Sequence, residues 1–137
     1  MIIRKPAKED LPALSALWQE AFGDTPEDVE NFYSTAFSFE RCLMAEEQKP
    51  VGGIYWIDAR ISGQKVAYLY AFAVAEECRG QGIGKTLLAK ALETLKGEGY
   101  AAAILVPGEK TLCAYYEKAG FVTFEKARAP ETCAPGM

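Results

Sequence analysis

Apolar side chains recur at helical spacing in two segments near the start of the chain. We expect the first helix to begin at Asp10, a common N-cap residue, and to end at Gly23. We expect the second to begin at Thr25, another N-cap residue, with Pro26 at the first helical position. The apolar positions that define the two helices are Leu11, Leu14, Leu17, Trp18, Val29, Phe32, Tyr33 and Phe37. The pattern predicts a helical pair in which Trp18 belongs to the core.

Alternating apolar positions predict strands before and after these helices. We expect short strands at residues 1–4 and 41–45, and longer ones at residues 49–61 and 65–75. Residues 61–64 contain a Ser-Gly pair and predict a hairpin turn. Alternate positions of the last strand hold Tyr68, Tyr70, Phe72 and Val74. Because the connections among the last three of these strands are too short for crossovers, antiparallel pairing of those three is expected.

The second half of the chain predicts alternating helices and strands. Leucines on one face predict a helix at residues 85–96, and a nearly continuous apolar run predicts a buried strand at residues 100–106. That strand should lie parallel to the one at residues 65–75, because a helix connects them. A last helix is expected at residues 109–119 and a final strand at residues 121–126.

Length and composition indicate one globular domain. The chain has 137 residues, of which 50% are hydrophobic and 25% charged. We expect a domain over residues 1–126 and a tail over residues 127–137, where two prolines and a glycine predict irregular or partner-associated structure. A sheet edge left open by this tail favours a homodimer. No apolar stretch reaches the ~20 residues of a membrane span, and no signal peptide pattern is present. We therefore expect a cytoplasmic protein with no membrane partner.

The ionisable residues exclude several kinds of chemistry. The chain has no histidine, which removes every mechanism that relies on a histidine base. Its four cysteines are far apart, so we expect reduced thiols and no metal site. The net charge of −4 argues against nucleic acid as a partner and is compatible with a cationic or amine substrate.

One glycine-rich segment between a predicted strand and a predicted helix carries most of the candidate chemistry. It reads Arg79-Gly80-Gln81-Gly82-Ile83-Gly84-Lys85. Alternate glycines allow a tight turn whose N–H groups point together, and the helix start adds positive potential, which suits a pyrophosphate. A Walker A loop would need a glycine at position 79, and a dinucleotide fingerprint one at position 85. Both nucleotide patterns miss by one residue, although an ATP site and a simple packing turn remain open alternatives.

The segment does match the pattern [QR]xxGx[GA], through Arg79, Gly82 and Gly84. With the preceding strand end at residues 72–74 and the later Tyr-Tyr-Glu-Lys-Ala-Gly-Phe at residues 115–121, the chain resembles the GNAT acetyltransferase superfamily from about residue 3 to residue 124. The resemblance implies an α/β fold of the α+β type. It has a mixed, mostly antiparallel sheet of about six strands, four flanking helices, and strands that splay apart at the acetyl-CoA site.

The resemblance also implies a function and a set of site residues. The implied reaction is acetyl transfer from acetyl-CoA to a primary amine, of a small molecule or a peptide, without a metal; the alternative is an acyl-CoA-binding sensor or interaction module. The residues implied to bind acetyl-CoA are Phe72, Ala73, Val74, Arg79, Gly80, Gln81, Gly82, Ile83, Gly84 and Lys85. Tyr116 is the implied general acid, whereas Tyr55 and Tyr70 are candidates for an aromatic acceptor pocket. The candidate bases are Asp58, Glu76 and Glu77, and Glu109 stands where the family often has asparagine.

Overall fold

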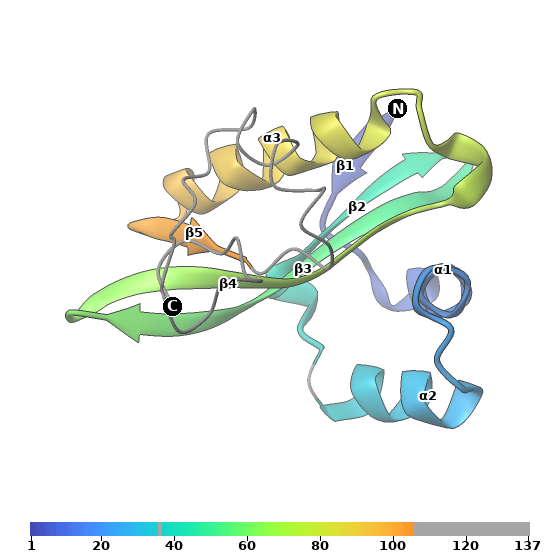
Figure 1. Cartoon of the computed structure of the whole chain (residues 1–137), viewed down its shortest axis with the longest axis horizontal. Helices are drawn as coiled ribbons and strands as arrows, with labels where there is room; N and C mark the ends of the chain where they lie inside the picture. The colour runs from blue at the N-terminus through green and yellow to red at the C-terminus, as the bar shows by residue number, and fades with distance from the viewer. Residues whose placement is uncertain (36, 106–137) are drawn as a thin grey trace, which may run out of the picture. The chain divides into compact units, whose positions relative to one another are not determined.

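The computed structural model describes residues 1–35 and 37–105, whose strands form one mixed sheet in the order β1-β2-β3-β4-β5 (Figure 1). The strands are β1 (Ile2–Arg4), β2 (Cys42–Glu47), β3 (Lys49–Ile61), β4 (Gln64–Val74) and β5 (Ala102–Ile104). The helices are α1 (Leu11–Phe22), α2 (Pro26–Thr35) and α3 (Ile83–Gly97), with short 3-10 turns η1 (Lys8–Asp10), η2 (Phe39–Arg41) and η3 (Glu76–Cys78). The described residues divide into two compact units, Met1–Trp56 with Ala71–Ala91, and Ile57–Tyr70 with residues 92–105.

In the first unit, antiparallel pairing follows the predicted pattern. Ile3 pairs with Ala45 between β1 and β2, and Met44 pairs with Gly53 between β2 and β3. The register shifts between Ala45 and Glu46, which marks a bulge near the turn into β3. The antiparallel arrangement predicted from the short connection between β2 and β3 is therefore confirmed.

The core of the first unit lies between strand and helix side chains. Met44 and Ile54 from the sheet are inaccessible to solvent, as are Leu14 of α1 and Leu87 of α3. Burying each such side chain stabilises the packed state by about 1.5 to 3 kcal/mol. Trp18 is 9% exposed, so its predicted place in the core is confirmed.

In the second unit, the predicted hairpin is present. Ser62 and Gly63 have φ angles of 53° and 79°, the left-handed conformation that a tight hairpin turn of this kind requires. Val66 pairs with Ala102 in parallel, as predicted, and the N–H of Ala101 donates to the carbonyl of Lys65 over 2.8 Å. The strand expected at residues 100–106 is β5, which begins only at Ala102 because the turn at Gly99 precedes it.

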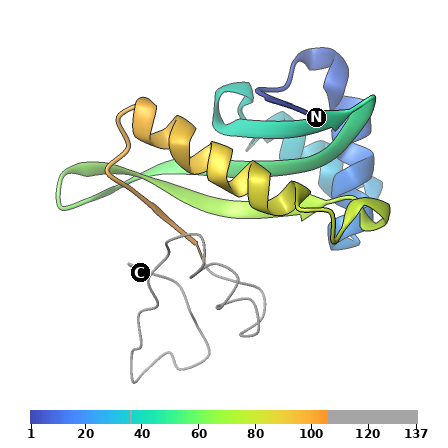
Figure 2. The same cartoon turned by 90° about the horizontal axis from the view of Figure 1, so that it is seen from above.

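Figure 2 shows α3, which follows the glycine segment along the chain, from a second direction. The helix covers the range predicted from its leucine pattern and begins two residues earlier, at Ile83. The expected helix at residues 109–119, the strand at residues 121–126 and the tail lie outside the described residues. Within the part of the chain described, the fold has five strands and three α-helices, against about six and four expected for the whole domain. Among the described helices, none is both long and apolar enough to cross a membrane.

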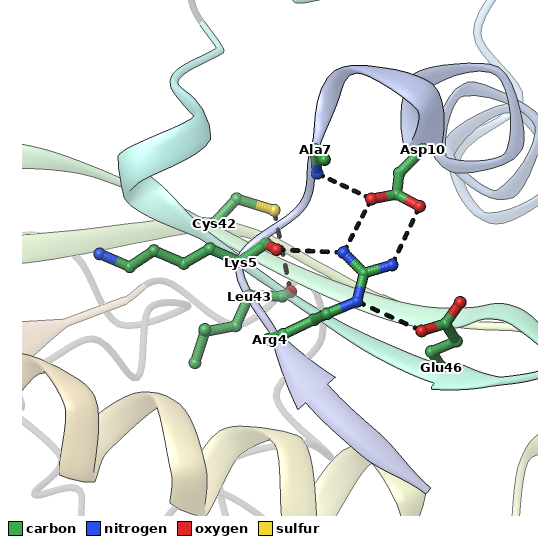
Figure 3. A network of polar contacts seen from close by, with 7 residues as sticks. All are labelled: Arg4, Lys5, Ala7, Asp10, Cys42, Leu43 and Glu46. Atoms are coloured by element: carbon green, nitrogen blue, oxygen red, sulfur yellow. Dashed lines mark hydrogen bonds and ion pairs between the residues drawn. The ribbon is translucent and has the colours of Figure 1, made fainter.

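Asp10 has a different role from the helix cap that the sequence predicts (Figure 3). Its carboxylate accepts hydrogen bonds from the Arg4 guanidinium over 2.9 and 3.1 Å, and from the N–H of Ala7 over 2.7 Å. The physical reason is that η1 runs directly into α1, so Asp10 already has helical dihedral angles and cannot turn back to cap α1. Hydrogen bonding to Arg4 holds the pKa of Asp10 below its usual range.

Candidate functional site

The glycine segment forms an open turn between β4 and α3. Gly80 and Gly82 have φ angles of 82° and 80°, a left-handed conformation that disfavours any residue with a side chain. A Cβ atom built at either glycine would meet no atom within 4 Å, so the space beside the backbone is open. Left-handed residues within such a turn let successive N–H groups face one concavity, which binds anions. The turn predicted from the glycine spacing is thus present.

The start of α3 adds further N–H donors to this turn. The N–H of Thr86 donates to the carbonyl of Gly82 over 3.0 Å, and the Thr86 hydroxyl donates to the same oxygen over 2.9 Å. Helical geometry leaves the N–H groups of Ile83, Gly84 and Lys85 without intrahelical acceptors. The Ile83 side chain is buried and anchors the first turn. With the helix dipole, these donors suit a phosphate or pyrophosphate group.

Arg79 ties the glycine turn to the end of β4. Its Nε donates to the carbonyl oxygen of Val74 over 3.2 Å, although the side chain is exposed. Gln81 donates from its side-chain amide to the carbonyl of Glu77 over 3.4 Å. The side chains of both predicted binding residues therefore donate hydrogen bonds that stabilise the turn itself. The N–H groups suited to bind a phosphate belong to the main chain.

Two contacts from distant parts of the chain position the start of the turn. The N–H of Ala75 donates to the carbonyl of Val51 over 2.8 Å, and the N–H of Glu76 donates to a carboxylate oxygen of Glu20 over 3.0 Å. Glu20 lies at the end of α1, and the sequence did not predict it as a site residue. Its hydrogen bond with Glu76 joins residues 56 positions apart, so no local pattern could indicate it.

The end of β4 is closely packed against β3. A Cβ atom at Gly52 would lie 3.3 Å from the carbonyl oxygen of Ala73 and 3.3 Å from the Leu87 side chain, so a larger residue there would have to displace its neighbours slightly. Ala73 is 6% exposed, whereas Phe72 and Val74 are half-buried. The predicted strand residues and the glycine turn form one continuous segment of the first unit.

The other predicted site residues lie in several environments. Tyr55 is 1% exposed and its hydroxyl oxygen lies 2.6 Å from that of Tyr33, whose pKa burial raises above its usual range. Tyr70 is half-buried in the second unit, and Tyr116 lies outside the described residues, as does Glu109.

Among the candidate bases, Asp58 accepts a hydrogen bond from the Tyr100 hydroxyl. Glu76 and Glu77 are exposed, and Glu77 lies 3.4 Å from Lys49. In the described ranges, no three histidine, cysteine or acidic side chains gather as a metal site.

Comparison with known proteins agrees with this geometry. The model of the Acetyltransferase (GNAT) family matches residues 11–121. A ribosomal-protein-alanine N-acetyltransferase from Brucella melitensis is 26% identical, with 91% of this chain and 86% of that chain covered and a TM-score of 0.70. A GNAT family N-acetyltransferase from Escherichia coli, solved with CoA, is 24% identical over 88% of this chain and 67% of that chain, with a TM-score of 0.71.

A third similar structure is that of the NatC complex bound to Gag peptide and CoA. It is 18% identical, covers 97% of this chain and 93% of that chain, and has a TM-score of 0.74, which shows a shared fold. Comparison with curated proteins gave no match. Because the family model spans most of the chain, including the glycine turn, the protein belongs to the GNAT family of acetyltransferases, which are acyltransferases.

Proposed function

We propose that the protein transfers the acetyl group of acetyl-CoA to a primary amine. The observation that carries this proposal is the open turn at Gly80 and Gly82, which leads into the N-terminus of α3. Main-chain N–H groups at this turn are suited to the pyrophosphate of coenzyme A. The half-buried Phe72 and Val74, with Ala73 between them, are assigned to the pantetheine arm.

Acetyl-CoA supplies an activated thioester carbonyl, so the protein's task is to bind it, exclude water and move protons. The amine must lose one proton to become nucleophilic and another as the amide forms, and the departing thiolate must gain one. We assign protonation of the thiolate to Tyr116, because a phenol with a pKa near ~10 can protonate a thiolate whose conjugate acid has a pKa near ~8.5. We assign no base, since the exposed Glu76 and the hydrogen-bonded Asp58 are both compatible with other roles.

A peptide amine fits the proposal as well as a small molecule does. The similar protein from Brucella melitensis is named as an enzyme that acts on the alanine of a ribosomal protein, and the NatC structure contains a peptide. We therefore include peptide N-termini and lysine side chains among the acceptors to be tested.

The test is a transfer assay over a panel of small amines and peptides, read by the thiol released from acetyl-CoA. We expect release that depends on the amine, and a Tyr116→Phe variant that binds acetyl-CoA normally but turns over ~10²-fold more slowly or worse. Unchanged turnover in that variant would remove the acid role. Binding of acetyl-CoA without transfer to any amine would overturn the proposed function in favour of an acyl-CoA-binding module.

A further inference from the structure

The strand β3 continues past the last pair that it forms with β2. That pair joins Cys42, the first residue of β2, to Tyr55, whereas β3 ends at Ile61. Among the described residues, the only strand beside residues 57–61 is therefore β4, on one edge (Figure 1). We call residues 57–61 the open strand. The other edge of such a strand presents main-chain groups with which a further strand can pair.

The hairpin turn decides which main-chain groups of the open strand face its free edge. Ser62 and Gly63 both have positive φ angles and form a two-residue loop, the kind whose flanking residues exchange hydrogen bonds across the hairpin. The direction of hydrogen bonding alternates along a strand, so the main-chain groups of Ala59 also point toward β4. Those of Asp58 and Arg60 point toward the free edge.

The side chains of the open strand form a pattern that is complementary to itself. The order Ile-Asp-Ala-Arg-Ile has an isoleucine at each end and opposite charges on either side of the central alanine. Ile57 and Ile61 are 42% and 41% exposed, and Asp58 and Arg60 are exposed as well. Because side chains alternate along a strand, the apolar ones share one face and the charged ones share the other.

We propose that the open strand joins two copies of this chain in a twofold-symmetric dimer. Antiparallel pairing centred on Ala59 places Asp58 opposite the partner's Arg60, and Ile57 opposite the partner's Ile61. The symmetry repeats both pairs with the copies exchanged. The residues whose N–H and C=O groups point toward the free edge are then the ones that exchange hydrogen bonds between the copies.

Charge complementarity selects both the occupant and the register. Moving the pairing by two residues in either direction would place Asp58 opposite itself or Arg60 opposite itself, and like charges directly opposite each other are unfavourable. Moving it by one residue would bring the apolar face of one copy beside the charged face of the other. A second copy paired about Ala59 avoids both costs, so it fits this edge better than a strand of unrelated sequence.

The two charged side chains have contacts in their own chain that the pairing leaves intact. One carboxylate oxygen of Asp58 accepts a hydrogen bond from the hydroxyl of Tyr100, and Arg60 donates from one nitrogen to the carbonyl of Gly63 over 3.2 Å. A carboxylate accepts several hydrogen bonds and a guanidinium has five N–H donors, so each group can also bind its counterpart in the second copy. The existing contacts orient the charges before the copies meet.

The expected dimer is weak and depends on concentration. A contact of five residues from each copy is smaller than a standard stable interface, so we expect a dissociation constant of roughly 10 to 100 µM. The sequence led us to expect a homodimer through a sheet edge beside the tail, whereas this inference places the contact on β3. It does not depend on the proposed function.

The experiment measures the dissociation constant of the dimer by analytical ultracentrifugation from about 1 µM to 1 mM protein. Asp58→Arg and Arg60→Asp each place like charges opposite each other, so each should weaken dimerisation at least tenfold. An equimolar mixture of these two variants restores an opposite charge at every pair. The mixture should therefore dimerise about as tightly as the wild type.

Two control variants reverse charges at exposed positions elsewhere. Glu27→Arg on α2 and Lys90→Glu on α3 should leave the dissociation constant unchanged, both alone and when mixed. Ile57→Lys retains both charged residues of the open strand and the Tyr100 hydrogen bond, and should weaken dimerisation at least tenfold. Thermal unfolding shows which variants are folded, and Ile57→Lys decides the question if Asp58→Arg is not.

The outcomes separate the inference from its alternatives. Loss of the dimer in each single charge reversal and its recovery in the mixture would support the pairing about Ala59. A wild type that stays monomeric up to about 1 mM would overturn the inference, as would equal effects of the test and control variants. A mixture of Asp58→Arg and Arg60→Asp that stays monomeric, with both variants folded, would overturn it too.

Discussion

The Nε of Arg79 lies 3.2 Å from the carbonyl oxygen of Val74, so the first residue of the glycine turn holds the last residue of β4. Strand end and turn are both assigned to acetyl-CoA, and this bond fixes one relative to the other. The side chain therefore acts on binding by positioning main-chain groups, and its positive charge adds to the potential of the turn.

An Arg79→Ala variant should weaken acetyl-CoA binding about tenfold, because a hydrogen bond from a charged donor contributes roughly 1.5 kcal/mol. Isothermal titration calorimetry measures the dissociation constant directly. Arg79→Lys keeps the charge but cannot reproduce the bond from Nε. Its dissociation constant should therefore lie between those of the wild type and Arg79→Ala. An unchanged dissociation constant in Arg79→Ala would contradict the positioning role.

Glu20 provides a second test of how the turn is positioned. Glu20→Ala removes the acceptor for the N–H of Glu76 and should raise the KM for acetyl-CoA about three- to tenfold. Glu20→Gln keeps a side-chain oxygen at the same reach, so it should stay close to the wild type. If both variants behave alike, the hydrogen bond does not position the turn.

The Arg4–Asp10 pair predicts how stability responds to acid. The hydrogen bond from Arg4 holds the folded-state pKa of Asp10 below the unfolded value of about 3.9. The contribution of the Asp10 carboxylate to the free energy of unfolding is therefore fully present at a pH above that unfolded pKa. It is lost as the pH falls through the lower folded-state pKa. Asp10→Asn should cost about 1 to 3 kcal/mol at pH 7.

Urea unfolding at neutral pH and below pH 4 measures this effect. The difference in unfolding free energy between the wild type and Asp10→Asn should narrow in acid. A difference that stays constant down to pH 2 would show that Asp10 stabilises the fold by some means other than its charge.

The hydroxyl pair of Tyr33 and Tyr55 predicts a coupled stability effect. Each single change to phenylalanine should cost about 0.5 to 1.5 kcal/mol, because the two oxygens are 2.6 Å apart and partly buried. The double variant should cost less than the sum, since the bond can be lost only once. Thermal or urea unfolding of the four proteins gives the coupling energy, and strict additivity would argue against an energetically significant bond.

Local chemistry explains what could be predicted from the sequence. The strand predicted at residues 49–61 is β3 (Lys49–Ile61), and the hairpin follows from a Ser62-Gly63 pair that accepts left-handed angles. The glycine turn was predictable for the same reason, because Gly80 and Gly82 carry their conformational preference in their identity.

Contacts between different helices, strands and turns could not be predicted from local sequence patterns. Asp10 has the side chain of a helix cap, but Arg4 and the direct run of η1 into α1 give it another role. Glu20 and Tyr33 gain their partners through packing of elements that are far apart in the sequence.

The central claim is that main-chain groups of the turn at Gly82 bind acetyl-CoA, and thermal unfolding with this ligand tests it most directly. At one hundred times its dissociation constant, acetyl-CoA should stabilise the wild type by about 2.7 kcal/mol. Gly82→Val should lose this stabilisation, because valine disfavours a φ of 80°, whereas Gly97→Ala, outside the turn, should keep it. A wild type that acetyl-CoA does not stabilise, or a Gly82→Val variant stabilised to the same extent, would contradict the account.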